Sequence, residues 1–477
     1  MNILFIVSET LKKRLGGTNP LKPLRNQEEI HYGVSYISAM LKKHGYNTDV
    51  FVVTRYTKNA EIDKAINQFK PQLIGFSAVF REFESIAKIA KYINETHPSI
   101  LLLAGGAHPT LEPQEAINAS FDIVCIGEGE YPILELVQQL ESGQTPTKIH
   151  NLWIKKTDGT IEKNPTRQFV QNLDELPYPD RDIWQKWIKN KKSIHNVIIG
   201  RGCPFNCTYC CNHVLRQVAE GKYVRFRSPQ NVIGEIKEII EKFPDTDTIF
   251  LEAEALNLNQ EYLYDFCDQL AQFNKTLKKP ISYGANIRLI ANFDAEKTMR
   301  YFTKANIVIV NIGLESGSER VRRDILKRGE YTNDDVRRAV RAAKKYHRHT
   351  MLFVLLGIPS ETYQEFEETL EITKECRPSF IHLGIFTPYP GTVLYDYCVE
   401  NNYISKDTYH EKGRSVASLD MEGFSKKQVQ KEYYNFFANV YAKSKFQHIR
   451  IKLSSYLILK WNLSFVFERT LKYIRSI

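Results

Sequence analysis

The chain has 477 residues, of which 43% are hydrophobic and 25% charged, and its formal net charge is +10. These fractions are ordinary for a globular protein and argue against a disordered, collagen-like or coiled-coil chain. No run of about 18 uncharged apolar residues occurs, and the start NILFIVS lacks a basic segment, so we expect a cytoplasmic protein without a membrane span.

The first 145 residues alternate short apolar runs, such as NILFIVS, NTDVFVV and LIGFSAV, with amphipathic helical patterns. Apolar strands separated by such helices predict a doubly wound, Rossmann-like parallel sheet that is covered on both faces. Glycine and polar residues follow two of these strands, at residues 105–110 and 127–130. Ligands of open parallel sheets bind at this carboxyl edge, so residues 1–145 are predicted to bind a cofactor.

The rest of the chain divides into three further segments. Prolines punctuate residues 146–194, which we interpret as a linker. Residues 195–395 contain six strand candidates alternating with helices, which predicts a partial (β/α)6 barrel of the TIM type. Residues 396–477 are helical in pattern, aromatic-rich and basic, and residues 441–477 carry eight Lys and Arg against one acid. The fold class is therefore α/β, with a helical C-terminal region.

Three of the eight cysteines, Cys203, Cys207 and Cys210, have the spacing C-x3-C-x2-C directly after a predicted strand. Three thiolates on one loop can bind three irons of a [4Fe–4S] cluster and leave the fourth iron open to a small molecule. The alternative is zinc, but a structural zinc site needs four ligands, usually in two separated pairs. Cys211 could be the fourth thiolate, although adjacent residues rarely reach one metal together.

The cysteine motif and the segments that follow it resemble the radical S-adenosylmethionine enzymes. The further matches are YVRFRSPQNVIGEI, the segment 313–318 (GLESGS) and the segment 357–362 (GIPSET). The resemblance implies that the open iron binds the amino and carboxylate groups of S-adenosylmethionine. Reductive cleavage would then give methionine and a 5′-deoxyadenosyl radical.

The same resemblance implies a set of contacts to S-adenosylmethionine. They are Tyr209, Glu252, Glu254, Arg288, Glu315 and Ser316. One segment departs from the family, because the second barrel strand usually ends in paired aspartates and here reads Phe-Leu-Glu252-Ala-Glu254. Either glutamate could hold the methionine ammonium, and Arg288 could pair with the carboxylate. A surface ion pair would explain Arg288 almost as well, and a solvated strand-end turn would explain Glu315.

The N-terminal domain resembles the cobalamin-binding domain of B12-dependent radical enzymes, among them the class B methylases. This resemblance implies cobalamin contacts at Ser77, Gly105, Gly106, His108, Thr110, Gly127, Glu128, Gly129 and Glu130. The motif Asp-x-His-x-x-Gly, which supplies a histidine to cobalt in other cobalamin proteins, is absent. His108 is therefore interpreted as a loop histidine that contacts the corrin edge or the nucleotide tail. The alternative is a domain that keeps its shape without a cofactor.

Together these features predict a cobalamin-dependent radical S-adenosylmethionine methyltransferase, which moves a methyl group from methylcobalamin to an unactivated carbon. One alternative is a cyclase or oxidative rearrangement enzyme like the anaerobic porphyrin-ring cyclase, and another is a binding protein without turnover. We expect a small-molecule or lipid-like substrate, an electron donor of the flavodoxin or ferredoxin type, and no nucleic acid. The basic tail either lies on a membrane surface or packs over the barrel.

Overall fold

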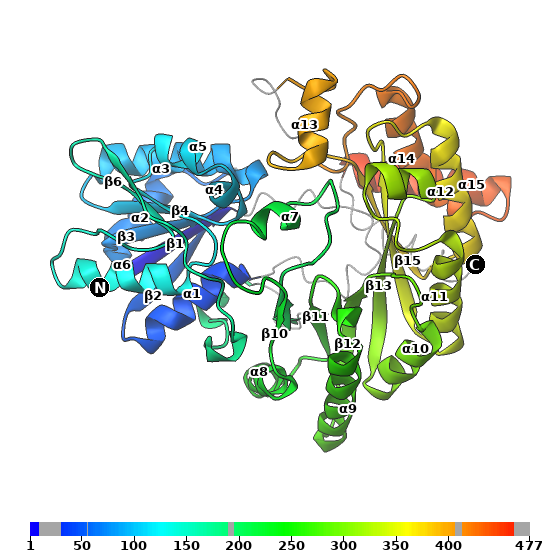
Figure 1. The fold of residues 1–477 in the computed structure, drawn as a ribbon, viewed down its shortest axis with the longest axis horizontal. Helices are drawn as coiled ribbons and strands as arrows, with labels where there is room; N and C mark the ends of the chain where they lie inside the picture. Colours follow the sequence, from blue (N-terminus) through cyan, green and yellow to red (C-terminus); the bar gives the residue numbers. More distant parts are fainter. Residues whose placement is uncertain (9–29, 55, 189–194, 406–412, 462–477) are drawn as a thin grey trace.

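The computed structural model describes residues 1–8, 30–54, 56–188, 195–405 and 413–461, with the side chains of 454–461 excepted. Two α/β units lie side by side (Figure 1), the N-terminal one in blue and cyan and the second one in green and yellow. The predicted fold class is confirmed, since a doubly wound sheet is followed by a six-stranded parallel barrel and by C-terminal helices.

The N-terminal sheet has the strand order β2-β1-β3-β4-β5-β6-β7. Its parallel strands are β1 (Asn2–Ser8), β2 (Asn47–Val53), β3 (Leu73–Ser77), β4 (Leu101–Gly105) and β5 (Ile123–Cys125). Successive strand residues point to opposite faces. In β1, accordingly, Phe5 packs into the core on one face and Leu4 into the core on the other.

Helices cover both faces of this sheet, as the continuous apolar strands require. One core includes residues of α1 (Tyr32–Lys43) and α6 (Glu130–Glu141). The other includes residues of α2 (Asn59–Phe69), α3 (Phe80–Thr96) and α5 (Pro113–Asn118). A short helix, α4 (Ala107–Leu111), follows β4 directly.

The sheet continues past residue 145, where the sequence predicts the linker to begin. Strands β6 (Leu152–Lys155) and β7 (Ile161–Lys163) add an antiparallel hairpin to β5. Between them lies a turn at Asp158-Gly159, where Gly159 has a φ of +84° that favours glycine. The Asp-Gly pair therefore marks a hairpin of the first domain, and the irregular connection to the barrel starts only after β7.

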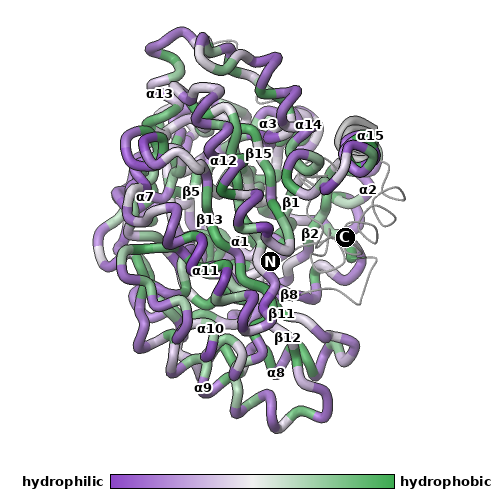
Figure 2. Tube along the Cα trace, turned by 90° about the vertical axis from the view of Figure 1, so that its right-hand side faces the viewer, coloured by the Kyte–Doolittle hydropathy of each residue, from purple (hydrophilic) through white to green (hydrophobic). Residues whose placement is uncertain are grey.

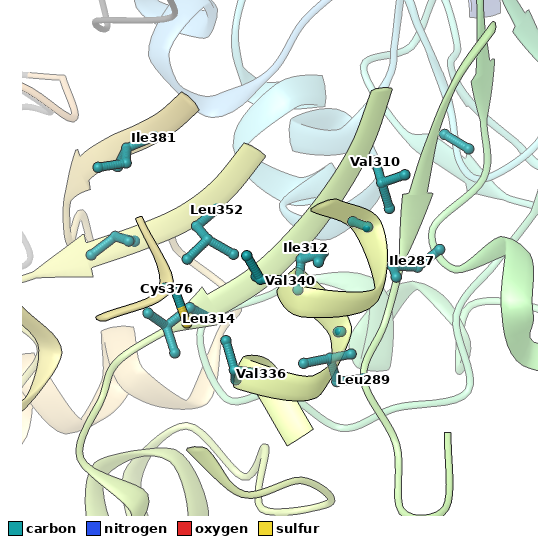
Figure 3. Close-up of a cluster of buried hydrophobic side chains, with 14 of the residues drawn as sticks. Ile287, Leu289, Val310, Ile312, Leu314, Val336, Val340, Leu352, Cys376 and Ile381 are labelled. Atoms are coloured by element: carbon teal, nitrogen blue, oxygen red, sulfur yellow. The ribbon is translucent and has the colours of Figure 1, made fainter. Parts of the chain in front are cut away.

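The second sheet contains six parallel strands in chain order. They are β8 (His195–Ile198), β11 (Thr248–Glu252), β12 (Ser282–Ile287), β13 (Ile307–Glu315), β14 (His349–Leu356) and β15 (Phe380–Ile385). The helices of this unit are α8 (Pro229–Lys242), α9 (Gln260–Thr276), α10 (Ala295–Lys304), α11 (Asn333–Lys345) and α12 (Tyr363–Cys376). Figure 3 shows Val336 and Val340 of α11 packed against Ile312 and Leu314 of β13.

A short ladder joins the barrel to the loop that carries the cysteines. Strand β9 (Gly200–Arg201) pairs antiparallel with β10 (Arg225–Phe226), and the loop between them contains α7 (Asn212–Leu215). In Figure 1 this loop lies between the two α/β units.

The C-terminal helices are α13 (Val393–Glu400), α14 (Lys426–Tyr441) and α15 (Lys445–Trp461). Phe436 of α14 is buried against Phe366 of α12, so this helix packs over the barrel. Helix α15 continues to the edge of the molecule (Figure 2), and residues 462–477 of the predicted basic tail lie outside the described residues. Among the described helices, none is long and apolar enough to cross a membrane.

Candidate functional site

Two cavities adjoin each other where the two α/β units meet. The first, which we call the interdomain cavity, has a volume of about 360 Å³ and lies between the strand ends of the N-terminal sheet and the cysteine loop. The second, the barrel cavity, has a volume of about 590 Å³ and lies at the carboxyl ends of the barrel strands. Ile198, Arg201 and Gly202 line both cavities, so a ligand in one would lie next to a ligand in the other.

Eight of the nine residues predicted to contact cobalamin line the interdomain cavity. They are Ser77, Gly105, Gly106, Thr110, Gly127, Glu128, Gly129 and Glu130. Gly106 and Gly127 have φ values of +101° and +81°, and these turns bring main chain, not side chains, to the surface of the cavity.

Apolar side chains such as Phe5, Leu103 and Ile133 form much of the remaining wall of the interdomain cavity. Sites for cofactors are typically lined by apolar groups with a few placed polar groups. A surface of glycine backbone and apolar side chains fits the broad, largely apolar face of a corrin.

His108 is the exception, and its interpretation as a loop histidine is wrong. It lies in α4, is 3% exposed, and is not among the residues that line the interdomain cavity. Its ring centroid is 4.1 Å from that of Phe83, and its Nε2 is 3.3 Å from a carboxylate oxygen of Glu115. The left-handed turn at Gly106 starts the helix at once, which places the imidazole beneath α3.

Glu128 and Glu130 face the barrel unit and form ion pairs with it. Arg225 donates from both Nη atoms to Glu128 at 3.0 Å, and Arg201 donates to Glu128 at 2.9 Å and to Glu130 at 2.6 Å. Burial alone would raise the pKa of Glu128, but the bonds and charges of Arg225 and Arg201 lower it. The sequence indicated these glutamates as cofactor contacts and gave no sign of these partners.

The three cysteines of the motif lie on the loop after β9 and line the barrel cavity. The amide of Cys210 donates to the carbonyl of Cys207 at 3.1 Å, and Thr208 bonds Leu326 and Ile325, so the loop is held to the barrel. A hydrogen bond from Cys211 lowers the pKa of Cys210 to about 6, which favours the thiolate. Burial raises the pKa of Cys203 to about 11, so a metal bound there must displace a proton.

The cysteines fit a [4Fe–4S] cluster. Within the described residues, no group of three His, Cys, Asp or Glu side chains converges as the ligands of one metal ion. Cluster ligands bind separate irons, so they need not converge. Arg288 donates to Sγ of Cys207 at 3.2 Å and stacks 3.5 Å from the ring centroid of Phe205. Because thiolates accept such charged hydrogen bonds, the pocket is suited to an anionic cluster.

The two glutamates that end β11 have different surroundings. Glu252 accepts from the side-chain amides of Asn196 at 3.1 Å and Asn286 at 3.0 Å. Glu254 lines the barrel cavity and is partly accessible to solvent; the loss of water around its carboxylate raises its pKa, and a hydrogen bond from Asn212 opposes this. Both carboxylates line the cavity, but Glu254 is the better placed to meet an ammonium group.

Glu315, Arg328 and Tyr209 form the opposite wall of the barrel cavity. The Nη2 of Arg328 is 3.7 Å from Glu315 and its Nη1 is 3.5 Å from the Tyr209 hydroxyl. A Cβ at Gly313 would come within 2.6 Å of the ends of the Arg328 and Glu315 side chains, so a larger residue there would displace this pair. Ser316 is not in this wall, because it is fully buried and its hydroxyl bonds Thr369 and the amide of Ser318.

A row of polar side chains crosses the barrel interior, and Glu252 is the one member of the row that the sequence indicated. Asn196, Glu252, Asn286 and Asn311 come from four neighbouring strands and are joined by hydrogen bonds of 2.9–3.1 Å. The Oδ1 of Asn311 is buried without a partner, and Asn311 lines the barrel cavity. A buried acceptor without a partner indicates a place where a bound ligand could donate a hydrogen bond.

Comparison with known proteins identifies both units. A B12 binding domain model matches residues 25–137, and a Radical SAM superfamily model matches residues 197–372. An uncharacterized methyltransferase of Pyrococcus horikoshii is 28% identical over 458 residues, which are 93% of this chain and 93% of that protein. An anaerobic magnesium-protoporphyrin IX monomethyl ester cyclase of Rubrivivax gelatinosus is 26% identical over 82% of this chain and 68% of its own length.

Two solved structures have the same fold. The cobalamin-dependent S-adenosylmethionine radical enzyme OxsB, with aqua-cobalamin bound, superposes with a TM-score of 0.71 at 14% identity over 99% of this chain and 75% of that chain. The radical S-adenosylmethionine methyltransferase TsrM of Kitasatospora setae, with cobalamin and a [4Fe–4S] cluster bound, has a TM-score of 0.64 at 14% identity, covering 90% and 85%.

Proposed function

The chain belongs to the radical S-adenosylmethionine enzymes that carry a B12-binding domain, and we propose that it transfers a methyl group to an unactivated carbon of a small-molecule substrate. Its cofactors are a [4Fe–4S] cluster, S-adenosylmethionine and cobalamin. The observation that carries the proposal is the shared wall of the two cavities at Ile198, Arg201 and Gly202. A methyl group can pass between two cofactors only if they face each other.

The bound cofactors supply a 5′-deoxyadenosyl radical and a transferable methyl group, while the chain binds and orients them. In this proposal Cys203, Cys207 and Cys210 hold the cluster. Glu254 accepts from the methionine ammonium, and Arg288 pairs with the methionine carboxylate. The carboxylate of Glu315, held by Arg328, accepts from ribose hydroxyls.

The interdomain cavity is proposed to bind cobalamin by shape. The main chain at Gly105, Gly106 and Gly127 allows the close approach of a macrocycle, and Phe5 and Leu103 contact its apolar face. Among the described residues, no histidine lines the interdomain cavity, and His108, which was not expected to bind cobalt, is buried elsewhere. We propose that the described part of the domain contributes a surface and not a metal ligand.

The relatives favour methyl transfer over the two alternatives. The methyltransferase relative aligns over 93% of both chains, whereas the cyclase relative aligns over 68% of its own length. The cyclase or oxidative reaction stays the second candidate because the cyclase of Rubrivivax gelatinosus aligns with 82% of this chain. A protein without turnover is the third, and the departure at Glu252 and Glu254 is the feature that favours it.

The deciding experiment uses anaerobically purified full-length protein, reconstituted with iron, sulfide and hydroxocobalamin and reduced by a flavodoxin or ferredoxin system. With S-adenosylmethionine and substrate, methionine, 5′-deoxyadenosine and S-adenosylhomocysteine should all accumulate. If 5′-deoxyadenosine forms but S-adenosylhomocysteine never does, methyl transfer is wrong and a cyclase or oxidative reaction takes its place. If neither forms, the protein is not a catalyst of this type.

We also propose that α15 contacts an anionic membrane surface, which would suit a lipid-like substrate. Phe446, Ile449 and Leu453 lie at helical spacing and are 73%, 65% and 58% exposed. The basic residues Lys445, Arg450 and Lys452 are on the same helix. An apolar stripe flanked by basic residues is typical of interfacial helices. Replacing the three apolar residues by Ser should abolish sedimentation with phosphatidylglycerol vesicles, and unchanged sedimentation would contradict the proposal.

A further inference from the structure

Four charged residues form a compact cluster at the junction of the two α/β units. Glu128 lies in the turn two residues before α6, Glu130 is the first residue of α6 in the N-terminal unit, and Arg201 and Arg225 come from β9 and β10 beside the barrel. The side chains are 3–20% exposed, and the two negative charges balance the two positive ones. Buried pairs of this kind are sensitive to loss of one partner, because the other charge is then left uncompensated.

Additional hydrogen bonds tie this cluster to both units. The backbone amide of Val170 donates to Glu128 at 2.7 Å, and Arg225 donates to the carbonyl of Val170 at 2.7 Å and to that of Tyr223 at 3.1 Å. Arg201 lies over the ring of Tyr36, 5.0 Å from its centroid. The short ladder of β9 and β10 is therefore fastened to the N-terminal unit through Glu128.

The ladder leads directly into the cysteine loop. Arg201 is two residues before Cys203, and Gly202 between them has a φ of +89°. A side chain at Gly202 would meet the carbonyl oxygen of Tyr223 at 2.2 Å, so loop and β10 are in close backbone contact. The connection between the charged cluster and Cys203 is therefore short and has little conformational freedom.

The cluster also occupies a distinct place relative to the two cavities. All four residues line the interdomain cavity, and Arg201 lines the barrel cavity as well. A second buried group of charges, Arg181, Glu235 and Arg227, is just as tight but lines neither cavity. Stability of the fold alone would not require a charged group at the boundary of the cavities.

We propose that Glu128 is a positioning residue that acts through Arg201 and Arg225. It holds the cysteine loop at a fixed distance from the interdomain cavity, so that the cofactors in the two cavities face each other. This role rests on the proposed function, because it matters only if a methyl group passes between the cavities. Cleavage of S-adenosylmethionine to 5′-deoxyadenosine and methionine needs only the barrel cavity.

S-adenosylmethionine can react in two ways, and their products distinguish a loss of cavity alignment from a loss of folding. Transfer of its methyl group to reduced cobalamin would break the sulfur–methyl bond and leave S-adenosylhomocysteine. Reductive cleavage would take one electron from the reduced cluster, and the adenosyl radical, without substrate, would take a hydrogen atom from the buffer and leave 5′-deoxyadenosine. Both products can be measured with reconstituted holoenzyme and no substrate. The ratio of S-adenosylhomocysteine to 5′-deoxyadenosine therefore reports the alignment of the cavities.

The test compares Glu128→Gln with Glu135→Gln at saturating hydroxocobalamin. Glu135 is the matched control, because it forms a two-bond ion pair with Arg167 at 2.9–3.0 Å in α6, the helix that follows Glu128, but lines neither cavity. For Glu128→Gln we expect the product ratio to fall at least about tenfold, since an aligned reaction is sensitive to displacements of about 1 Å. Backbone hydrogen exchange at residues 198–203 should also become faster, and Glu135→Gln should change neither.

Several results would overturn the positioning role. A parallel loss of both products together with iron would mean that Glu128 only supports the fold, and an unchanged ratio would mean that it positions nothing. A ratio restored by raising the hydroxocobalamin concentration would make Glu128 a ligand of the cofactor instead. Glu128→Asp, which keeps the charge on a shorter side chain, provides the same test if the Gln variant does not fold.

Failure of the proposed function gives a different pattern. If the wild-type protein forms 5′-deoxyadenosine and no S-adenosylhomocysteine, methyl transfer is wrong regardless of Glu128. In that case, hydrogen exchange at residues 198–203 tests only whether Glu128 anchors the cysteine loop. Unchanged exchange in Glu128→Gln would overturn this anchoring role.

Discussion

The two cavities share a wall but are lined by residues of different chemical character. The interdomain cavity is lined mainly by glycine backbone and apolar side chains, with charges gathered where it meets the barrel. The barrel cavity is lined by cysteines and by charged side chains, among them Glu254, Arg288, Glu315 and Arg328. The first is suited to recognise a large ligand by shape, and the second to bind and activate a charged one.

This difference decides which substitutions should matter. In the barrel cavity single side chains carry the chemistry, so truncating one should remove a function while the fold persists. In the interdomain cavity the main chain provides the surface, so the effective substitutions are those that add atoms or shift the backbone.

The largest effect is expected for Cys207→Ala. This thiol is buried, bonded by Arg288 and proposed to bind one iron of the cluster. Its removal should lower bound iron and sulfide by most of their content and abolish formation of 5′-deoxyadenosine. Cys211→Ala is the matched control, because Cys211 is proposed to bond Cys210 and not the cluster. Equal loss of iron in both variants would make Cys211 a ligand.

Arg288→Leu should give the next largest effect. The guanidinium contacts Cys207 and Glu330, and its Nε–H is buried without a partner, so that N–H can still donate a hydrogen bond to a ligand. Losing a charge-assisted bond in a dry site costs about 1.5–3 kcal/mol, which corresponds to roughly 10- to 100-fold weaker binding of S-adenosylmethionine. Binding is measured by the change that S-adenosylmethionine causes in the electron paramagnetic resonance spectrum of the reduced cluster. Arg338→Leu, whose arginine side chain on α11 is 60% exposed, is the control.

Glu254→Gln should weaken binding of S-adenosylmethionine about tenfold, which is the loss expected for one charged hydrogen bond. The same change at Glu252 keeps the shape of the side chain but turns one of its two acceptor oxygens into a donor facing an asparagine amide. We therefore expect Glu252→Gln to lower thermal stability and Glu254→Gln to leave it unchanged. Reversed results would assign the methionine ammonium to Glu252.

The sequence predicted the lining of both cavities equally well, since all the expected contacts except His108 and Ser316 line them, and the reason is physical. Cysteine spacing and strand-end glutamates are local patterns, and parallel strands bring their carboxyl ends to one edge without further information. The same alternation of apolar runs and helices gave the fold class. The hairpin of β6 and β7 was missed because its strands are three and four residues long and only partly apolar.

Contacts between distant segments account for the other misses. Glu128 bonds Arg201 and Arg225, which lie 73 and 97 residues further along the chain, and nothing local in the sequence encodes those pairs. Ser316 belongs to a segment that resembles a cofactor contact, but the left-handed backbone of Glu315, with φ +58°, is followed by a buried serine. His108 was missed in the same way, because the side of α4 on which it falls depends on the turn at Gly106.

The smallest effects are expected at two glycines of the interdomain cavity, and they test whether its surface is backbone. Gly106 has φ +101° and ψ −170°, a conformation almost restricted to glycine, and an added Cβ would lie 2.8 Å from the carbonyl oxygen of Ala78. Gly106→Ala should therefore lower the free energy of unfolding by about 1–3 kcal/mol. Gly33 lines the same cavity within α1, but an added Cβ would meet no atom of the described residues within 4 Å. Gly33→Ala should raise stability by about 0.5–1 kcal/mol, because alanine favours the helix.

Measuring both cobalamin affinity and thermal unfolding in the two variants distinguishes backbone strain in the protein from direct contact with the ligand. Gly106→Ala displaces the turn that faces the ligand, so affinity and stability should fall together. Gly33→Ala adds a methyl group that meets none of the described protein atoms, so we interpret any loss of affinity as contact with cobalamin itself. If the cavity recognises cobalamin through close approach to its backbone, Gly33→Ala should bind cobalamin more weakly without becoming less stable. Unchanged affinity in Gly33→Ala would place the macrocycle away from α1, against β3 to β5 and the glycines that follow them.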